Sequence, residues 1–253
     1  MKQTIAITNQ KGGVGKTTTA INLAACLADQ NTSVLLLDLD PQGNATSGLG
    51  LDKDGASPTT YELLWGQATL DQTVQQTSRA GLYVTPANAN LAAAEVDLAD
   101  AENREFRLQQ ALQPAAYDFI IIDCPPALGL LTVNALTAAH AMLIPVQSEY
   151  YALEGLGQLL ATVQRVRQGL NPSLDLLGVL LTMYDKRTSL SDQVRDELKE
   201  HFGDKVFKIE VPRNVRLAEA PSFGKTIHEH DRWSKGARAY KQLAKEVVKR
   251  VNT

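Results

Sequence analysis

Residues 9–18 read Asn9-Gln10-Lys11-Gly12-Gly13-Val14-Gly15-Lys16-Thr17-Thr18. They follow an apolar run, Thr4–Thr8, and precede a helical pattern, Ala20–Ala28, so a glycine-rich turn joins a strand to a helix. Such a turn lets backbone N–H groups surround phosphate oxygens at the start of a helix. Lys16 would reach the terminal phosphates, and the Thr17 hydroxyl would be a ligand for Mg²⁺. The pattern therefore predicts a site for a phosphate-bearing ligand.

Beyond this turn, short apolar runs alternate with helical patterns. Runs rich in β-branched residues or leucine predict buried strands at Thr4–Thr8, Val34–Asp38, Leu82–Thr85, Phe119–Asp123, Ala141–Val146, Leu176–Thr182 and Val206–Val211. Apolar residues at three- and four-residue spacing predict helices at Ala20–Ala28, Leu91–Leu98, Phe106–Leu112, Leu130–Ala139, Leu153–Val166 and Leu190–Phe202. The alternation indicates an α/β fold, a mainly parallel twisted sheet with helices on both faces. Ligands of such sheets bind beyond the carboxyl ends of the strands.

Length and composition are those of an ordinary globular protein. The 253 residues are 44% hydrophobic and 21% charged, which excludes a disordered or collagen-like chain. We expect a single domain over residues 1–253, because no long linker or internal repeat interrupts the pattern. No apolar stretch approaches the ~20 residues that span a bilayer, and the N-terminus lacks a secretory signal, so we expect a cytoplasmic protein. Cys26 and Cys124 indicate neither a disulfide framework nor a multi-cysteine zinc site.

Charge is divided unevenly along the chain. Up to Tyr184 there are 9 Lys/Arg against 17 Asp/Glu, whereas Asp185 to Thr253 holds 16 against 11. The basic last quarter is compatible with an anionic partner and equally with an ordinary solvated surface.

Three carboxylates follow predicted strands and are candidates for metal or water chemistry. Asp38 and Asp40 are two residues apart, so they lie on the same face if the strand continues. Asp123 ends the apolar run Phe119–Ile122, where a charge is unexpected unless it meets a ligand. We interpret Asp123 as a carboxylate that reaches Mg²⁺ through water. A carboxylate that only caps the next helix is the alternative.

The glycine-rich turn departs from the usual G-x-x-x-x-G-K-[ST] pattern, because Gln10 replaces the first glycine and a second lysine, Lys11, stands within the turn. In this form it resembles the deviant Walker A motif of the ParA/MinD group of P-loop ATPases. Further blocks are similar to the Soj/ParA chromosome-partitioning ATPases: Val34-Leu-Leu-Leu-Asp38-Leu-Asp40-Pro41-Gln42-Gly43-Asn44-Ala45-Thr46, Ile120-Ile-Ile-Asp123-Cys124-Pro125-Pro126, Pro145-Val146-Gln147-Ser148-Glu149-Tyr150-Tyr151-Ala-Leu-Glu-Gly and Pro212-Arg213-Asn214-Val215-Arg216-Leu-Ala-Glu-Ala-Pro221. Together the blocks cover nearly the whole chain, in order.

The resemblance implies ATP and Mg²⁺ as cofactors and a role for each matching residue. Lys11 would cross a dimer interface to the phosphates of the partner subunit's ATP, and Asp40 would orient the attacking water. Thr17, Asp38 and Asp123 would bind Mg²⁺ directly or through its bound water. The expected nucleotide contacts are Lys11, Gly12, Gly13, Val14, Gly15, Lys16, Thr17, Thr18, Met183, Pro212 and Asn214. The alternatives are a solvated loop lysine for Lys11 and an ordinary turn residue for Asn214.

The resemblance also implies a homodimer that sandwiches ATP, nonspecific double-stranded DNA as a ligand, and a ParB-like partner that stimulates hydrolysis. Such a protein would drive chromosome or plasmid partitioning and would be nucleoid-associated. The expected DNA contacts are Arg187 and Arg216, with Lys186 and Lys225 as weaker candidates. No base-reading motif accompanies them, so they would contact phosphates only. Ordinary surface charge is the alternative for each.

Two other classes share the loop. A MinD-like ATPase that cycles on the membrane would end in a helix with large apolar residues on one face. Here the last helical pattern, Lys235–Val251, has a small, valine-rich stripe, which favours packing onto the sheet. An electron-transfer ATPase similar to the nitrogenase iron protein needs two exposed cysteines per chain. The positions of Cys26 and Cys124 do not suit an iron–sulfur cluster at a dimer surface, so we reject that class. No stable membrane association is expected.

Overall fold

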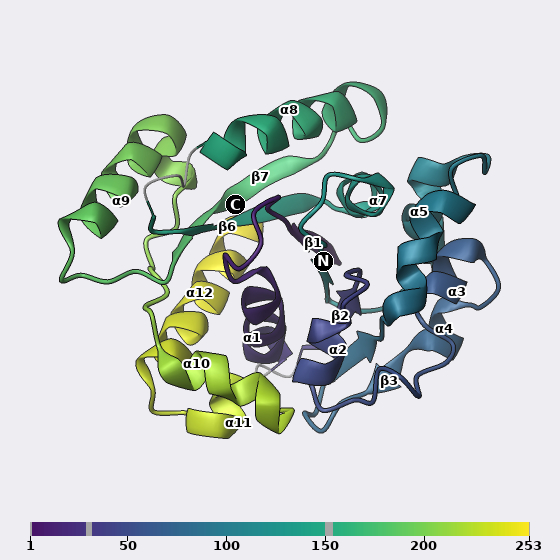
Figure 1. Ribbon diagram of the computed structural model, residues 1–253, viewed down its shortest axis with the longest axis horizontal. Coiled ribbons are helices and arrows are strands. Elements are labelled where there is room, and N and C mark those ends of the chain that lie inside the picture. The colour runs from purple at the N-terminus through teal and green to yellow at the C-terminus, as the bar shows by residue number, and fades with distance from the viewer. Residues whose placement is uncertain (1, 29–31, 150–153, 253) are drawn as a thin grey trace.

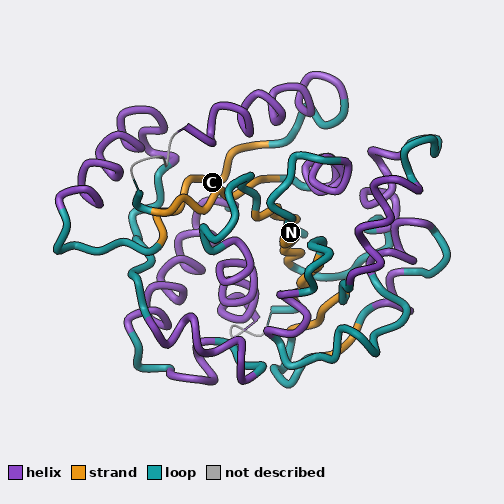
Figure 2. The backbone as a smooth tube through the Cα atoms, in the orientation of Figure 1, coloured by secondary structure: helices purple, strands orange, loops and turns teal. Residues whose placement is uncertain are grey.

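The computed structural model describes residues 2–28, 32–149 and 154–252. A seven-stranded sheet in the order β3-β4-β2-β5-β1-β6-β7 crosses its centre, with helices around it (Figure 2). All pairings are parallel except the short β3 against β4. The strands are β1 (Gln3–Ile7), β2 (Val34–Asp38), β3 (Gln75–Gln76), β4 (Leu82–Thr85), β5 (Phe119–Asp123), β6 (Ala141–Gln147) and β7 (Asp175–Thr182). The predicted fold class is confirmed.

Helices connect most of the strands and cover both faces of the sheet (Figure 1). They are α1 (Lys16–Ala28), α2 (Asn44–Gly48), α3 (Thr60–Trp65), α4 (Leu70–Thr73), α5 (Ala94–Asp97), α6 (Arg107–Ala111), α7 (Leu130–Ala138), α8 (Glu154–Gly169), α9 (Ser189–Phe202), α10 (Val215–Glu219), α11 (Ile227–Asp231) and α12 (Lys235–Val251). The predicted start of one helix, Leu153, lies outside the described residues. The predicted helix Leu91–Leu98 is a 3₁₀ turn, Ala89–Ala93, followed by α5.

Alternate side chains of the strands enter two separate cores. Ile120 and Ile122 of β5 pack on the face covered by α7 and α8, whereas Ile121 packs on the face covered by α1 and α12 (Figure 1). All three are fully buried. A strand that is apolar on both faces can satisfy both cores, which is why the continuous apolar runs of the sequence fold as central parallel strands.

Helix α12 is held against α1 by its apolar stripe. Its buried residues include Ala237, Tyr240, Leu243 and Val247, and the Tyr240 hydroxyl lies 3.1 Å from the Thr19 hydroxyl. The stripe therefore packs on the rest of the protein, as the sequence predicts. Among the described residues, no helix combines the length and the apolar character needed to cross a membrane.

The predicted strand Val206–Val211 is wrong. Two backbone N–H groups of this segment do bond to β7: Phe207 donates to the Val179 carbonyl and Val211 to the Leu181 carbonyl, each at 2.9 Å. However, these two donors are four residues apart while their acceptors on β7 are only two apart, so the segment leaves β7 between them and no regular ladder forms. Within this stretch the Lys208 N–H donates to the Glu246 carboxylate of α12, at 3.1 Å. Phe207 and Val211 are buried in the core that α12 covers, and burial alone does not make a strand.

The carboxyl ends of three central strands meet at one edge of the sheet. Asp123 at the end of β5 is in register with Ile7 of β1 on one side and with Asp38 of β2 on the other. The segments that follow these strands therefore lie side by side. They are residues 8–15, 39–43 and 124–129; the first contains the predicted site residues Lys11–Gly15, and the second contains Asp40.

Candidate nucleotide site and basic end

The turn after β1 curls tightly into α1. Gly13 and Gly15 have φ angles of 75° and 87°, a conformation that residues with a Cβ atom rarely adopt. Lys16 is 6% exposed, and its Nζ donates to the Lys11 carbonyl at 3.0 Å. Burial lowers the pKa of Lys16, while the charges of Asp123 and Asp40 oppose that shift. The turn thus holds a cation in a desolvated position, where its attraction for a phosphate is screened least.

Contacts from distant strands hold this turn in place. The Asn9 side-chain amide donates to the Pro145 carbonyl at 2.7 Å, and its oxygen accepts the Lys11 N–H at 3.0 Å. The Thr182 hydroxyl at the end of β7 donates to the Val14 carbonyl at 2.8 Å. Sequence reasoning missed both anchors, because no local pattern marks a partner more than a hundred residues away.

Lys11 and Gly12 lie on the open side of the turn. The Lys11 ammonium forms an ion pair with Glu149 at 3.3 Å, and both side chains are partly exposed. Glu149 also accepts a hydrogen bond from the Gln147 amide. A hollow of about 410 Å³ beside Lys11 is lined by Gln10, Lys11, Pro126, Leu128, Gly155 and Gln158. Among the described residues, a Cβ atom added at Gly12 would meet nothing within 4 Å, and Gly12 does not have a positive φ. Neither space nor backbone strain within the part of the chain that the structure describes explains that glycine.

Asp38 holds the chain that follows β2. It is fully buried, and its Oδ2 accepts from the Thr46 hydroxyl at 2.7 Å and from the Thr46 N–H at 2.8 Å. Its Oδ1 accepts the Asp40 N–H at 3.2 Å. Burial raises the pKa of Asp38 to about 6, although the hydrogen bonds from Thr46 and Asp40 lower it. Thr46 was not among the predicted site residues, yet it is the residue that satisfies this buried carboxylate.

Asp123 presents a bare carboxylate to the turn. It is fully buried, and neither oxygen has a hydrogen-bond partner that meets the usual distance and angle among the described residues. Burial raises its pKa well above the usual value, and the charge of Asp38 adds to that shift. The Thr17 hydroxyl and the Lys16 ammonium lie near enough to lower the pKa. A buried carboxylate is costly without a partner, so this geometry fits a cation or its bound water between Asp123 and Thr17.

Asp40 lies at the same edge and is 7% exposed. Its Oδ1 accepts the Gln42 N–H at 3.0 Å, and its carbonyl accepts the Gly43 N–H at 2.9 Å. These bonds fix the carboxylate at the start of the loop between β2 and α2. The structure thus brings Lys16, Thr17, Asp40 and Asp123 together around one place.

The segment predicted to frame the base lies next to the turn, beyond β7. Met183 has a φ of 51°, and its carbonyl accepts the Ser148 hydroxyl at 3.1 Å. The next residue, Tyr184, forms a β-bridge with Pro212. The Asn214 side-chain oxygen caps α10 by accepting the Leu217 N–H at 3.3 Å. Asn214 therefore has the role of a turn residue, which the sequence analysis gave as the alternative to a contact with the base.

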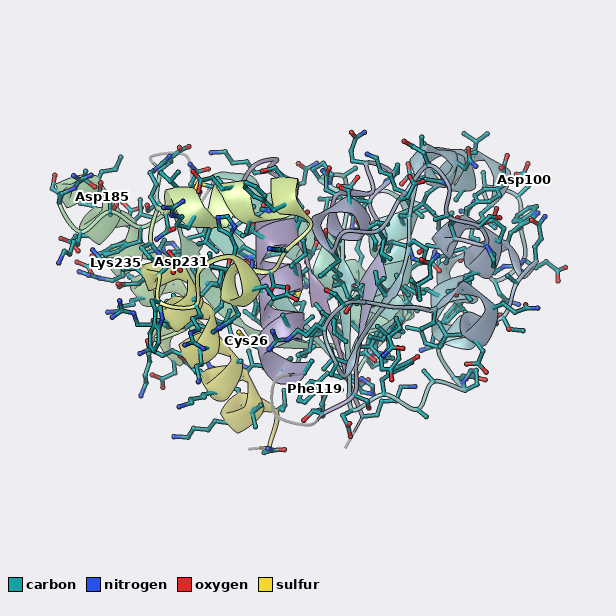
Figure 3. The ribbon with its side chains drawn as sticks, turned by 90° about the horizontal axis from the view of Figure 1, so that it is seen from below. Cys26, Asp100, Phe119, Asp185, Asp231 and Lys235 are labelled. Atoms are coloured by element: carbon teal, nitrogen blue, oxygen red, sulfur yellow. The ribbon has the colours of Figure 1, made fainter. Side chains whose placement is uncertain are left out.

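The predicted DNA contacts gather at one end of the molecule. Figure 3 shows Asp185, Asp231 and Lys235 at that end, with Asp100 at the opposite one. Arg187 is exposed and pairs with Asp185 at 2.7 Å, and this contact holds the pKa of Asp185 well below its usual range. A hollow of about 730 Å³ lies there, and its cationic lining residues are Lys186, Arg187, Arg213, Lys235 and Arg238.

Arg216 and Lys225 extend the basic surface. The Arg216 guanidinium pairs with Glu219 at 2.9 Å and lies 3.9 Å from Asp231. Lys225 is exposed in the segment between α10 and α11. Because the paired arginines are more than half exposed, their ion pairs are weak and an incoming phosphate can replace the carboxylates.

Comparison with known proteins assigns the family. Residues 2–176 match the family described as an AAA domain. The chain is 56% identical to the sporulation initiation inhibitor protein Soj of Bacillus subtilis, over 98% of this chain and 99% of that protein. It is 55% identical to the chromosome partitioning protein ParA of Myxococcus xanthus, over 97% of this chain and 88% of that protein.

Solved structures agree. A Mycobacterium smegmatis protein described as cobyrinic acid a,c-diamide synthase, with bound ADP and magnesium, superposes with a TM-score of 0.89 at 39% identity and covers 100% of this chain and 96% of its own. The cell division ATPase MinD of Pyrococcus furiosus superposes with a TM-score of 0.81 at 26% identity, over 98% of this chain and 99% of its own. With this sheet and this phosphate turn, the chain belongs to the ParA/Soj family of chromosome-partitioning P-loop ATPases, whose cofactors are ATP and Mg²⁺.

Proposed function

We propose that this protein is an ATP-dependent switch that dimerises with bound ATP, binds DNA nonspecifically as a dimer, and leaves the DNA after hydrolysis. A ParB-like protein that binds centromere-like sites would stimulate the hydrolysis, and the cycle would partition a chromosome or plasmid. The protein would act in the cytoplasm on the nucleoid. The family and the arrangement of the basic end support this proposal.

The residues around the turn fit Mg²⁺ and ATP. Backbone N–H groups of residues 12–18 and the Lys16 ammonium would hold the phosphates. Thr17 and Asp123 would hold the metal, because Asp123 is a buried carboxylate without a hydrogen-bond partner among the described residues. Asp38, whose oxygens already accept three hydrogen bonds, would act on the metal only through water. Bound Mg²⁺ neutralises phosphate charge, and Asp40 would orient the water that attacks.

Gly12 is the observation that carries the dimer. Nothing in residues 2–28, 32–149 and 154–252 requires glycine at this position, and Lys11 lies beside it on the open side of the turn. A second subunit that approaches the turn closely would require it, and Lys11 would then exchange its ion pair with Glu149 for the phosphates of the partner subunit's ATP. The charge of Lys11 would stabilise the negative charge that develops during hydrolysis.

The basic end supports DNA as the ligand of the dimer. Lys186, Arg187 and Arg216 are exposed cations, and the hollow that Lys186 and Arg187 line is large enough for a backbone phosphate. Two subunits would double the contacts, so the dimer would bind far more tightly than either monomer. The membrane is the less favoured surface, because the apolar stripe of α12 is buried against α1.

The test is DNA binding under three nucleotide conditions. We expect the protein with a slowly hydrolysed ATP analogue to be a dimer by light scattering and to bind unrelated duplexes about equally. With ADP or without nucleotide it should be a monomer that binds weakly. ATP-dependent sedimentation with vesicles, together with no ATP-dependent DNA binding, would overturn the proposal in favour of a membrane-cycling ATPase.

A further inference from the structure

Trp233 is a large apolar side chain that the core does not use. It lies in the turn between α11 and α12, and 72% of it is exposed. Apolar residues scattered singly on a surface are ordinary, but a tryptophan exposed to this degree forgoes most of the ~1.5–3 kcal/mol that burial of a large side chain contributes. The contacts that Trp233 makes therefore indicate whether its side chain is available to bind a ligand.

The turn fixes Trp233 on both sides of its backbone. The Trp233 N–H donates to the Asp231 carboxylate at 3.1 Å, and the Trp233 carbonyl accepts from the Arg238 guanidinium at 2.9 Å. The Arg232 guanidinium lies 4.8 Å from the centre of the indole ring. The backbone of the turn is thus fixed and the exposed ring lies beside a cation, and a fixed backbone lowers the entropic cost when a ligand binds.

Trp233 also lies between the two groups of predicted phosphate contacts. Arg238, which bonds to its carbonyl, lines the 730 Å³ hollow together with Lys186 and Arg187. Asp231, which bonds to its N–H, lies 3.9 Å from Arg216. The Trp233 backbone is therefore bonded to a residue beside each group, to Arg238 on one side and to Asp231 on the other. Asp185, Asp231 and Lys235 mark this end of the molecule in Figure 3.

We propose that Trp233 is a stacking contact for an unpaired DNA base, placed beside the cations that bind the backbone. This inference rests on the proposed DNA-binding function and adds a preference to it. In a duplex the faces of the bases are covered by their neighbours, whereas an unpaired base has a free face. An exposed indole beside arginines has the chemistry of the platforms that bind single-stranded nucleic acid.

The test compares single-stranded and blunt-ended duplex oligonucleotides of equal length, with the slowly hydrolysed ATP analogue. For Trp233→Ala we expect single-strand affinity to fall by about 5- to 150-fold, the range for removal of one stacked base. Duplex affinity should change by less than about twofold. The slope of affinity against salt should stay unchanged for both, because no phosphate contact is removed. Trp233→Phe should restore part of the single-strand affinity.

Phe223→Ala is the matched control. Phe223 is exposed to a similar degree at the same end, but its ring already stacks on His230 at 5.1 Å between centroids. Its removal should leave single-strand binding unchanged. Thermal melting shows whether either variant has lost its fold.

Fluorescence gives a second measurement. The chain has two tryptophans, and Trp65 ends α3 and packs against the core. In a Trp65→Phe background, single-stranded DNA should quench the emission of Trp233, and duplex DNA should quench it much less. Absence of quenching would contradict stacking.

The outcomes separate this inference from the function on which it rests. If the wild-type protein with ATP binds duplex DNA and Trp233→Ala leaves single-strand affinity unchanged, the stacking contact is overturned and the function stands. If Trp233→Ala weakens both kinds of DNA equally, the residue is a general contact and the preference is overturned. If no ATP-dependent DNA binding occurs at all, the proposed function itself fails.

Discussion

Thr46 joins two buried segments, and replacing it with valine should destabilise the protein strongly. Its hydroxyl donates to Asp38 Oδ2 at 2.7 Å and accepts the Ala87 N–H at 2.9 Å. Loss of a hydrogen bond to a charged group costs about 1.5–3 kcal/mol, and a buried N–H left without an acceptor costs about 1–3 kcal/mol. For Thr46→Val we therefore expect the free energy of unfolding to fall by about 2.5–6 kcal/mol, a large part of the ~5–15 kcal/mol of a typical domain.

The loss of stability caused by Thr46→Val should also depend on pH. Burial raises the pKa of Asp38 from its usual value of 3.8 to about 6, so between these values the native state binds more protons than the unfolded state. The free energy of unfolding therefore falls as pH rises through this window. The Thr46 hydroxyl lowers this pKa, so without it the window extends to higher pH. The deficit of Thr46→Val relative to wild type should be larger at pH 8 than at pH 5.

Urea denaturation without nucleotide measures both effects. Thr46→Ser keeps the hydroxyl and is the control, with an expected loss below about 1.5 kcal/mol for the missing methyl group. The reasoning is refuted if Thr46→Val loses less than about 1 kcal/mol, or if the serine variant loses as much as the valine variant.

Five further substitutions test the nucleotide site and the basic end. Lys16→Ala removes a charge-assisted contact, so ATP affinity measured by titration should fall by about 10- to 150-fold, and unchanged binding would remove Lys16 from the site. Asp40→Ala should lower turnover but accumulate as an ATP-bound dimer, because water positioning acts mainly in the transition state; only monomer on sizing with ATP would contradict this. Gly12→Val should bind ATP yet stay monomeric by light scattering, since a side chain there would meet the second subunit, and a dimer would count against the sandwich. Arg187→Ala or Arg216→Ala should weaken binding to all duplexes alike and reduce the salt slope by about 1 for each phosphate that is no longer neutralised, without affecting dimerisation.

Much of the fold could be predicted because buried parallel strands are apolar on both faces. The runs at Val34–Asp38 and Phe119–Asp123 match β2 and β5 residue for residue. The same reasoning was wrong for Val206–Val211, since Phe207 and Val211 are four residues apart but bond to β7 carbonyls only two residues apart, and apolar character reflects burial whatever the backbone bonds to. β3 is two residues long, too short for any periodicity to appear.

The turn of the candidate site could be predicted because its glycines, lysines and threonines are contiguous. The contacts that hold the site in place could not be predicted. The Thr46 hydroxyl, which donates to Asp38, comes from α2, beyond the loop that follows β2. The Thr182 hydroxyl donates to the Val14 carbonyl, and these two residues are 168 positions apart in the sequence. Hydroxyls of this kind are common everywhere in the chain, so only the folded arrangement distinguishes the ones that support the turn.

The hydrogen bond from Thr182 to the Val14 carbonyl has a thermodynamic consequence. Thr182 is the last residue of β7, and the chain runs from it directly into Asp185 and Arg187 at the basic end. A ligand that repositions the phosphate turn must shift or break this bond, and it thereby acts on the segment that leads to the basic end. Coupling free energy between two sites is reciprocal. If bound ATP raises the affinity of the basic end for a polyanion by some factor, a polyanion bound there must raise the affinity for ATP by the same factor.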